Sequence, residues 1–167
     1  MTDFERYVTE YSPQLTRFCM KLCGNIHDAE DLFQDTWARA LDKFDQYRPS
    51  YSFESWLFTI CANLYKNSKK LKYNSSKAVF ATQEEKERFI RSIPAEEKDV
   101  DAYLDLHTAM MELPKKHRLV LVLYYFRSFT QQEIADILDI PEGTVKSRLN
   151  TAKKLLKRRL YDEEDQR

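Results

Sequence analysis

The chain has 167 residues, and its 27 basic and 27 acidic side chains give a formal net charge of zero at pH 7. With only 2 glycines and 5 prolines, it suits neither sheet-rich folds, whose turns need glycine, nor glycine-rich phosphate loops. No apolar run approaches the ~20 residues of a membrane span, the amino terminus lacks an export signal, and the cysteines are too few for a disulfide framework. We expect an all-helical, cytoplasmic protein of one or two small domains.

The first 73 residues predict a small helical bundle. Ser12-Pro13 is typical of a helix start, because proline is favoured at the first helical position, and Gly24-Asn25 is typical of a helix end. Apolar residues then recur at helical spacing over residues 28–44. Ser52 can cap a third helix.

Residues 74–101 lose this regularity and predict a polar linker, with room for a short helix near 83–91. A second helical block follows over residues 102–162. Within it, residues 119–123 are continuously apolar, a pattern that fits either a strand or a buried helix. The flanking helices favour a buried helix.

Residues 127–160 carry the strongest signal. Thr130 and Glu133 form a capping box, residues 139–143 form a tight turn, and a longer basic helix follows from Thr144. A short helix, a turn and a longer helix make a helix-turn-helix, whose second helix enters the DNA major groove. The alternative is a plain helical hairpin with a basic solvent face.

Charge is distributed unevenly despite the neutral total. Residues 55–83 contain lysines, and residues 143–161 contain lysines and arginines, but neither stretch contains an acidic residue. Residues 81–104 carry seven acidic and four basic side chains. Two basic stretches are suited to a polyanion bound at two places. Solvated helix faces are the alternative reading.

These motifs resemble a known family. Residues 28–37 and 53–63 resemble region 2 of bacterial sigma-70-type initiation factors, and residues 133–149 resemble region 4, with Leu113-Pro114 and Arg118 upstream fitting the same domain. The presence of these two regions alone resembles the extracytoplasmic function (ECF) group. The resemblance implies a region 2 bundle over 1–73, a flexible linker over 74–101, region 4 over 102–162 and a tail over 163–167.

The resemblance also implies which residues bind. Asp31, Gln34 and Asp35 match the face that binds a coiled coil of the polymerase beta-prime subunit. The expected minus-10 DNA contacts are Tyr47, Arg48, Ser50, Tyr51, Asn63, Lys66, Asn67 and Lys70. The expected minus-35 contacts are Thr130, Gln131, Lys146, Ser147, Arg148, Asn150, Thr151, Lys153 and Lys154. The shape and base preference of the minus-10 loop stay open, because Pro49 stands where glycine is common in the family. Tyr47 has an alternative role, in which its ring packs against the helix.

The implied partners are core RNA polymerase, through its beta and beta-prime subunits, promoter DNA and an anti-sigma factor that can be membrane-anchored. No small-molecule substrate, cofactor, catalytic residue or metal is expected, because no catalytic set or ligand cluster is evident. Cys19, Cys23 and His27 have a spacing that suggests zinc, but a fourth ligand is missing; any redox or metal role of Cys19, Cys23 and Cys61 stays open. A stand-alone helix-turn-helix regulator is the second hypothesis, although it would not need the motifs over 28–70.

Overall fold

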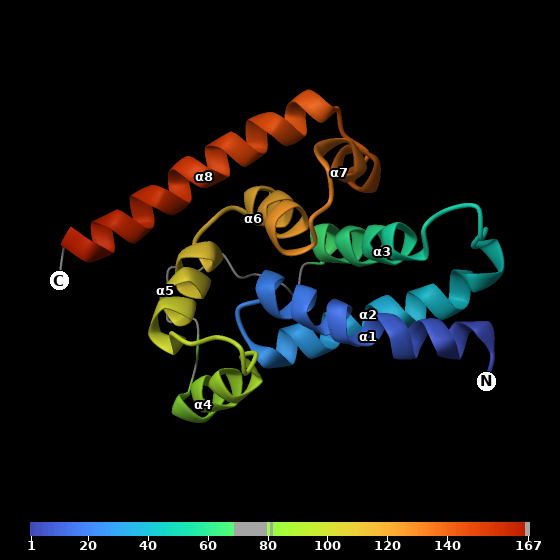
Figure 1. Ribbon diagram of the computed structural model, residues 1–167, viewed down its shortest axis with the longest axis horizontal. Coiled ribbons are helices and arrows are strands. Elements are labelled where there is room, and N and C mark those ends of the chain that lie inside the picture. Colours follow the sequence, from blue (N-terminus) through green and yellow to red (C-terminus); the bar gives the residue numbers. More distant parts are fainter. Residues whose placement is uncertain (69–79, 81, 166–167) are drawn as a thin grey trace.

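The computed structural model describes residues 1–68, 80 and 82–165, without the side chains of 162–165. This part of the chain is helical and contains no strand, as expected for the all-α class (Figure 1). Its elements are α1 (Asp3–Leu22), α2 (Ile26–Lys43), η1 (Phe44–Gln46), α3 (Phe53–Asn67), α4 (Gln83–Ser92), α5 (Val100–Met111), α6 (Lys115–Leu121), the π-helical turn η2 (Val122–Phe126), α7 (Gln131–Leu138) and α8 (Glu142–Asp165). We call α1–α3 the first block and α5–α8 the second block.

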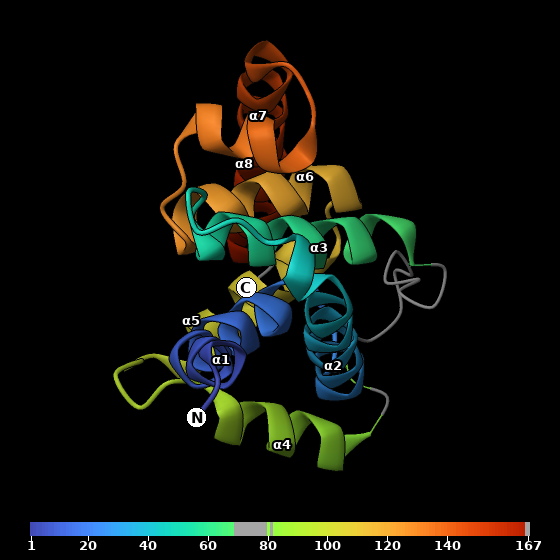
Figure 2. The same cartoon turned by 90° about the vertical axis from the view of Figure 1, so that its right-hand side faces the viewer.

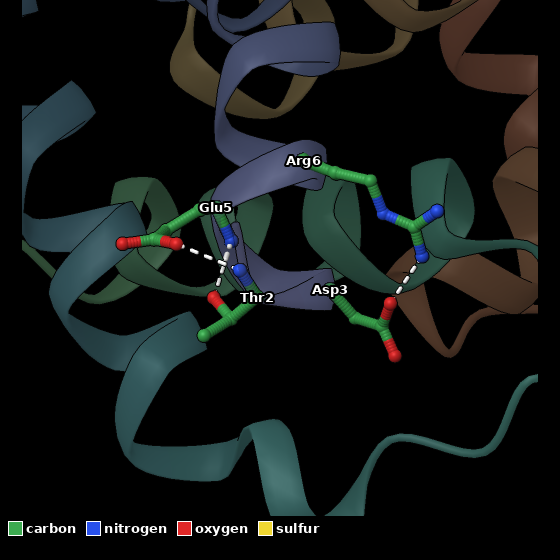
Figure 3. A network of polar contacts seen from close by, with 4 residues as sticks. All are labelled: Thr2, Asp3, Glu5 and Arg6. Atoms are coloured by element: carbon green, nitrogen blue, oxygen red, sulfur yellow. Dashed lines mark hydrogen bonds and ion pairs between the residues drawn. The ribbon is translucent and has the colours of Figure 1, made fainter.

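The start of α1 corrects one prediction. The helix begins at Asp3 and runs through Pro13, which the sequence pattern placed at its first turn. A capping box fixes this earlier start: the Thr2 hydroxyl accepts from the Glu5 amide at 3.1 Å, and the Glu5 carboxylate accepts from the Thr2 amide at 2.7 Å (Figure 3). Pro13 is exposed, so the hydrogen bond that it cannot donate is lost on the solvent side.

An aromatic cluster explains why α1 already begins at Asp3, well before Pro13. The Tyr7 ring stacks on Phe53 with centroids 3.9 Å apart, and Phe4 packs edge-on against Trp37 at 5.8 Å and Phe44 at 5.1 Å. These rings come from α1, α2, η1 and α3. Burial of large aromatic rings contributes enough to outweigh one missing backbone hydrogen bond.

Two other helices begin at the caps that the sequence predicted. Ser52 accepts from the Ser55 amide and starts α3, and Thr130 forms a capping box with Glu133 at the start of α7. Asn25, which was expected at the end of the first helix, also caps α2 by accepting from the Asp28 amide. Residues 119–123 lie in α6 and η2 and are buried, as the helical interpretation required.

The described part of the connector, residues 80 and 82–101, has more regular structure than a plain linker. It contains α4, which Thr82 caps, and Phe89 of α4 is buried against the His107 ring at 4.4 Å. Arg88 of α4 also forms an ion pair with Glu30 of α2. At the other end of the chain, α8 continues to Asp165 and so extends into the expected tail.

The two blocks share one hydrophobic core. The helix α3 packs against α6 and α7, and both views show it lying beside the second block (Figures 1 and 2). Fully buried side chains such as Phe58 of the first block and Leu123 and Ile134 of the second belong to the same cluster. None of the described helices is long and apolar enough to cross a membrane.

We expect Phe53→Ala to lower the free energy of unfolding by about 3–5 kcal/mol, because it deletes the ring on which the aromatic cluster is centred. Urea denaturation measures this change. The control is Tyr51→Ala at a side chain that is 70% exposed, which we expect to shift stability by less than about 0.5 kcal/mol. Equal effects of the two substitutions would contradict the assignment of the cluster.

Candidate nucleic-acid interface

The beginning of α8 presents a polar face away from the core. Val145, Leu149 and Ala152 are buried against the rest of the second block, and helical geometry then turns the intervening positions outward. The side chains of Lys146, Ser147, Asn150 and Thr151 are exposed, as the sequence predicted. Their amide, hydroxyl and ammonium groups are of the kinds that pair with base edges in a major groove.

Cationic side chains flank this face. Lys153 and Lys154 are exposed and Arg148 is half-buried. The Lys153 ammonium lies 5.5 Å from the centre of the Tyr125 ring, and a hydrogen bond with Tyr125 raises the pKa of Lys153. Cationic side chains at such positions are suited to phosphates on either side of a helix in a major groove.

The start of α7 adds two more polar groups. Thr130 is exposed, although its hydroxyl is engaged with the Glu133 amide at 3.1 Å, and Gln131 is half-exposed. The positive end of the α7 dipole lies at this point, where a phosphate would be favoured.

A second polar surface lies on α3. Asn63, Lys66 and Asn67 are exposed near the carboxyl end of the helix. The Lys66 ammonium is 3.5 Å from the carbonyl oxygen of Leu138, the last residue of α7. The expected contact Lys70 lies outside the described residues.

The loop between η1 and α3 presents one free aromatic ring. Arg48, Ser50 and Tyr51 are exposed, and the Tyr51 side chain is 70% exposed. The Tyr51 amide donates to the Arg48 carbonyl at 2.9 Å, so the loop contains a tight turn. An exposed ring beside a cationic side chain is suited to stacking an unpaired base.

Tyr47 has a different position from the rest of its predicted group. Its ring is half-buried and contacts Phe53 at 5.3 Å and Trp56 at 5.1 Å, and its hydroxyl donates to the Tyr51 carbonyl at 2.7 Å. Burial is the largest cause that raises the pKa of Tyr47. The packing interpretation therefore describes its contacts, and through them Tyr47 holds the loop that carries Tyr51.

The third predicted surface lies on α2. Asp31, Gln34 and Asp35 are exposed, whereas Leu32 and Trp37 face the core. Next to this surface, α1, α2 and the segment between α4 and α5 enclose an apolar cavity of about 400 Å³ that Gln34 also lines. An acidic and polar helix face beside apolar surface is suited to a protein partner rather than to DNA.

Sequence reasoning missed an apolar groove of about 500 Å³ on the second block. Leu106, Met110, Leu121 and Leu156 line it, Tyr125 and Phe126 lie at its edge, and Lys153 and Lys157 add charge. Tyr125 and Phe126 are 52% and 38% exposed. The only sign of this groove in the sequence was the pair Tyr125 and Phe126, which extends the apolar stretch that begins at residue 119.

The cysteines do not form a centre with His27. Cys19, Cys23 and Cys61 are buried, and the Sγ atoms of Cys19 and Cys61 are 4.0 Å apart. Burial raises the pKa of Cys19 and of Cys23, which disfavours their thiolates. His27 is exposed and lies 3.5 Å from the Asp31 carboxylate. Among the described residues, no group of three or more His, Cys, Asp or Glu side chains could hold a metal ion.

Comparison with known proteins identifies both blocks. The family model for sigma-70 region 2 matches residues 7–72, and that for sigma-70 region 4 matches residues 109–158. The ECF RNA polymerase sigma factor SigW of Bacillus subtilis (strain 168) is 30% identical over 168 residues, which cover 95% of this chain and 89% of that protein. The ECF RNA polymerase sigma factor SigL of Mycobacterium tuberculosis (strain H37Rv) is 31% identical over 160 residues, which cover 92% and 86%.

Two solved structures share the fold. One is the sigma factor RpoE in complex with the anti-sigma factor NepR from Bartonella quintana, with a TM-score of 0.74, 24% identity, and coverage of 96% of this chain and 98% of that one. The other is CnrH in complex with the cytosolic domain of CnrY, with a TM-score of 0.67, 21% identity, and coverage of 95% and 88%.

The buried His107 makes stability depend on pH. Burial, with smaller contributions from Lys21 and Arg118, lowers the pKa of His107 to about 4, although its ring lies 3.5 Å from the Gly24 carbonyl. The unfolded chain, with a His pKa of about 6.5, binds the proton first, so stability falls as pH falls from 6.5 towards 4.

We expect this histidine to contribute roughly 2 kcal/mol to the loss of stability between pH 7 and pH 4.5. His107→Gln keeps a polar side chain that cannot titrate, so its unfolding free energy should fall less over the same range. Urea denaturation at both pH values gives the comparison, in which the carboxylates common to both chains cancel. Identical pH dependence would show that His107 is not held neutral.

Proposed function

The chain belongs to the ECF RNA polymerase sigma factors, and we propose that it reads promoters with two separate surfaces, the start of α8 for the minus-35 element and the α3 surface for the minus-10 element. It is an alternative sigma factor that binds core RNA polymerase and directs initiation. The observation that supports this assignment is that the two surfaces differ in local structure and in side-chain chemistry. The α8 face is built on a helix-turn-helix, whereas the α3 surface combines an exposed ring with amide and ammonium groups.

The minus-35 element is proposed to bind as duplex DNA. Lys146 and Asn150 lie one helical turn apart on the exposed side of α8 and reach base edges, while Lys153 and Lys154 contact phosphates. Arg148 supports the flank of the same face.

The minus-10 element is proposed to bind after strand separation. Tyr51 stacks on an extruded base, Arg48 and Lys66 follow the backbone, and Asn63 and Asn67 offer amides to base edges. Tyr47 acts through its hydrogen bond to the Tyr51 carbonyl and thus positions this loop.

The α2 surface is proposed to bind the beta-prime subunit through Asp31, Gln34 and Asp35. The apolar groove of the second block offers an additional protein-binding surface, because its floor is apolar and its edge is aromatic. We also propose that the factor catalyses no reaction itself, acts in the cytoplasm with the polymerase, and is held inactive by an anti-sigma factor.

Run-off transcription tests the function directly. Purified bacterial core polymerase is combined with the chain and a pool of genomic promoter fragments, and the transcripts are sequenced. Starts that depend on the chain and share two spaced elements support the proposal. Selective duplex binding without core binding or transcription would favour the stand-alone regulator instead.

Lys146→Ala and Asn150→Ala should each weaken minus-35 selectivity by about 1–3 kcal/mol, since each removes a base-edge contact. Binding to core polymerase should not change. The matched variants Gln34→Ala and Asp35→Ala should weaken core binding and leave duplex binding unchanged. Fluorescence anisotropy with labelled duplex and with labelled core measures both. Loss of core binding in folded Lys146→Ala or Asn150→Ala protein would contradict this division.

Tyr51→Ala should reduce binding to a single-stranded minus-10 oligonucleotide by about 1–3 kcal/mol, because a stacking ring is lost. The matched variant Tyr51→Phe keeps the ring and should bind almost as well as the original chain. Fluorescence of 2-aminopurine in the oligonucleotide reports the stacking. Equal binding by the Ala and Phe variants would show that the ring does not contact the base.

A further inference from the structure

The apolar cavity beside α2 has no part in either DNA surface. Its volume of about 400 Å³ falls within the roughly 300–1,000 Å³ of small-molecule pockets. It lies between α1, α2, α5 and the segment that joins α4 to α5, and its apolar lining includes Met20, Ile26, Phe33, Pro94 and Tyr103. The cavity is therefore large enough for a small ligand, and its walls can remove apolar surface of that ligand from water.

One cation lines this cavity without a full counter-charge. Lys21 of α1 is half-buried, and its ammonium donates to the Tyr103 hydroxyl at 2.7 Å. The ammonium also lies 4.0 Å from the centre of the Tyr103 ring and 4.4 Å from that of Phe126. Burial lowers the pKa of Lys21 to about 8, and the smaller effect of nearby Glu97 opposes this. A hydroxyl and two rings thus surround the ammonium, but none of them carries a full negative charge.

The other charges of the lining leave the cavity positive. Among the described residues, no carboxylate forms an ion pair with Lys21 or with Arg17, which also lines the cavity. Glu30 is the carboxylate of the described lining, and Arg88 of α4 pairs with it. Two cations therefore remain for a ligand. Lys21 is the stronger anchor, because water screens the exposed Arg17 more than the half-buried Lys21.

We propose that this cavity binds a small molecule that combines a carboxylate with an apolar body. The carboxylate pairs with the Lys21 ammonium and supplies the full negative charge that the chain does not provide. The apolar body packs against Met20 and Phe33. The inference concerns a small ligand and does not depend on the proposed function, although Gln34, which also lines the cavity, places the site beside the proposed polymerase-binding surface.

The apolar groove of the second block is the competing location for such a molecule. Lys153 and Lys157 line that groove, but both are exposed. Water therefore screens a carboxylate at those lysines more than one at the half-buried Lys21. The two locations contain different methionines, Met20 in the cavity and Met110 in the groove. A measurement on methionine methyl groups consequently separates them.

Octanoate binding to the full chain tests the proposal by nuclear magnetic resonance. The methionines carry ¹³C at their methyl groups, and Met20→Leu assigns the reporter signal. We expect octanoate to shift the Met20 signal saturably and to leave the Met110 signal in place. Octanol has the same apolar chain without the charge, so we expect it to bind roughly tenfold more weakly than octanoate.

Two lysine variants test the anchor. We expect Lys21→Leu to weaken octanoate binding roughly tenfold, to the affinity of octanol, because the positive charge is lost while an apolar side chain stays. The matched variant Lys43→Leu removes an exposed lysine of α2 that does not line the cavity, and it should leave octanoate binding unchanged. Circular dichroism shows whether each variant keeps its helices. The comparison of octanoate with octanol in the original chain needs no substitution.

Several outcomes would overturn the proposal. Equal binding of octanoate and octanol would show that the cavity does not recognise the carboxylate. Unchanged octanoate binding by folded Lys21→Leu protein would show that Lys21 is not the anchor. A shift of the Met110 signal without a shift of the Met20 signal would place the molecule in the groove of the second block. Absence of any shift would show that the cavity does not bind a ligand of this class.

Discussion

A buried guanidinium determines how the parts of this chain meet. Arg118 cannot lose its charge and has five donors, so its complete burial requires acceptors on every side. The end of α5 and the turn after it supply three carbonyls, and the end of α1 and the Tyr65 hydroxyl supply two more acceptors. Burying Tyr65 raises the pKa of its hydroxyl, which keeps it neutral and able to accept. Helices that are remote in sequence are thereby brought to one point.

Local signals predicted local structure well. The capping residues Ser52 and Thr130 act over three residues, so the sequence alone located the starts of α3 and α7 closely. Asn25 was expected only at the end of the first helix, and its role as the cap of α2 was not predicted. The start of α1 was wrong because the local preference of Pro13 was outweighed by ring contacts with residues of α2, η1 and α3. The exposed positions of α8 followed from helical periodicity once the buried residues had been identified, because both depend on one helix.

Long-range pairs could not be predicted in this way. Nothing in the sequence pairs Arg118 with Leu22 or Lys115 with Ser68, since no periodicity joins positions so far apart. Tyr47 shows the same limit on a smaller scale: the sequence left open whether its ring binds DNA or packs against the helix, and the structure places the ring among residues of other elements. The apolar groove also forms between α5, η2 and α8, and each of these helices alone shows only an ordinary apolar stripe.

The uneven charge pattern explains the kind of contact that holds the blocks together. The stretches 55–83 and 143–161 contain no carboxylate, so cations there find no acidic partner within their own segment. Among the described residues, Glu54 and Arg127 are the one pair of opposite side-chain charges that joins the two blocks. Lys66 and Lys115 rely on carbonyls at helix ends, which carry only partial charge. A phosphate offers a full negative charge and binds lysine more strongly than a carbonyl does. Lys66, whose own segment has no acidic residue, therefore reaches the second block through a carbonyl, which is a weaker acceptor than a phosphate.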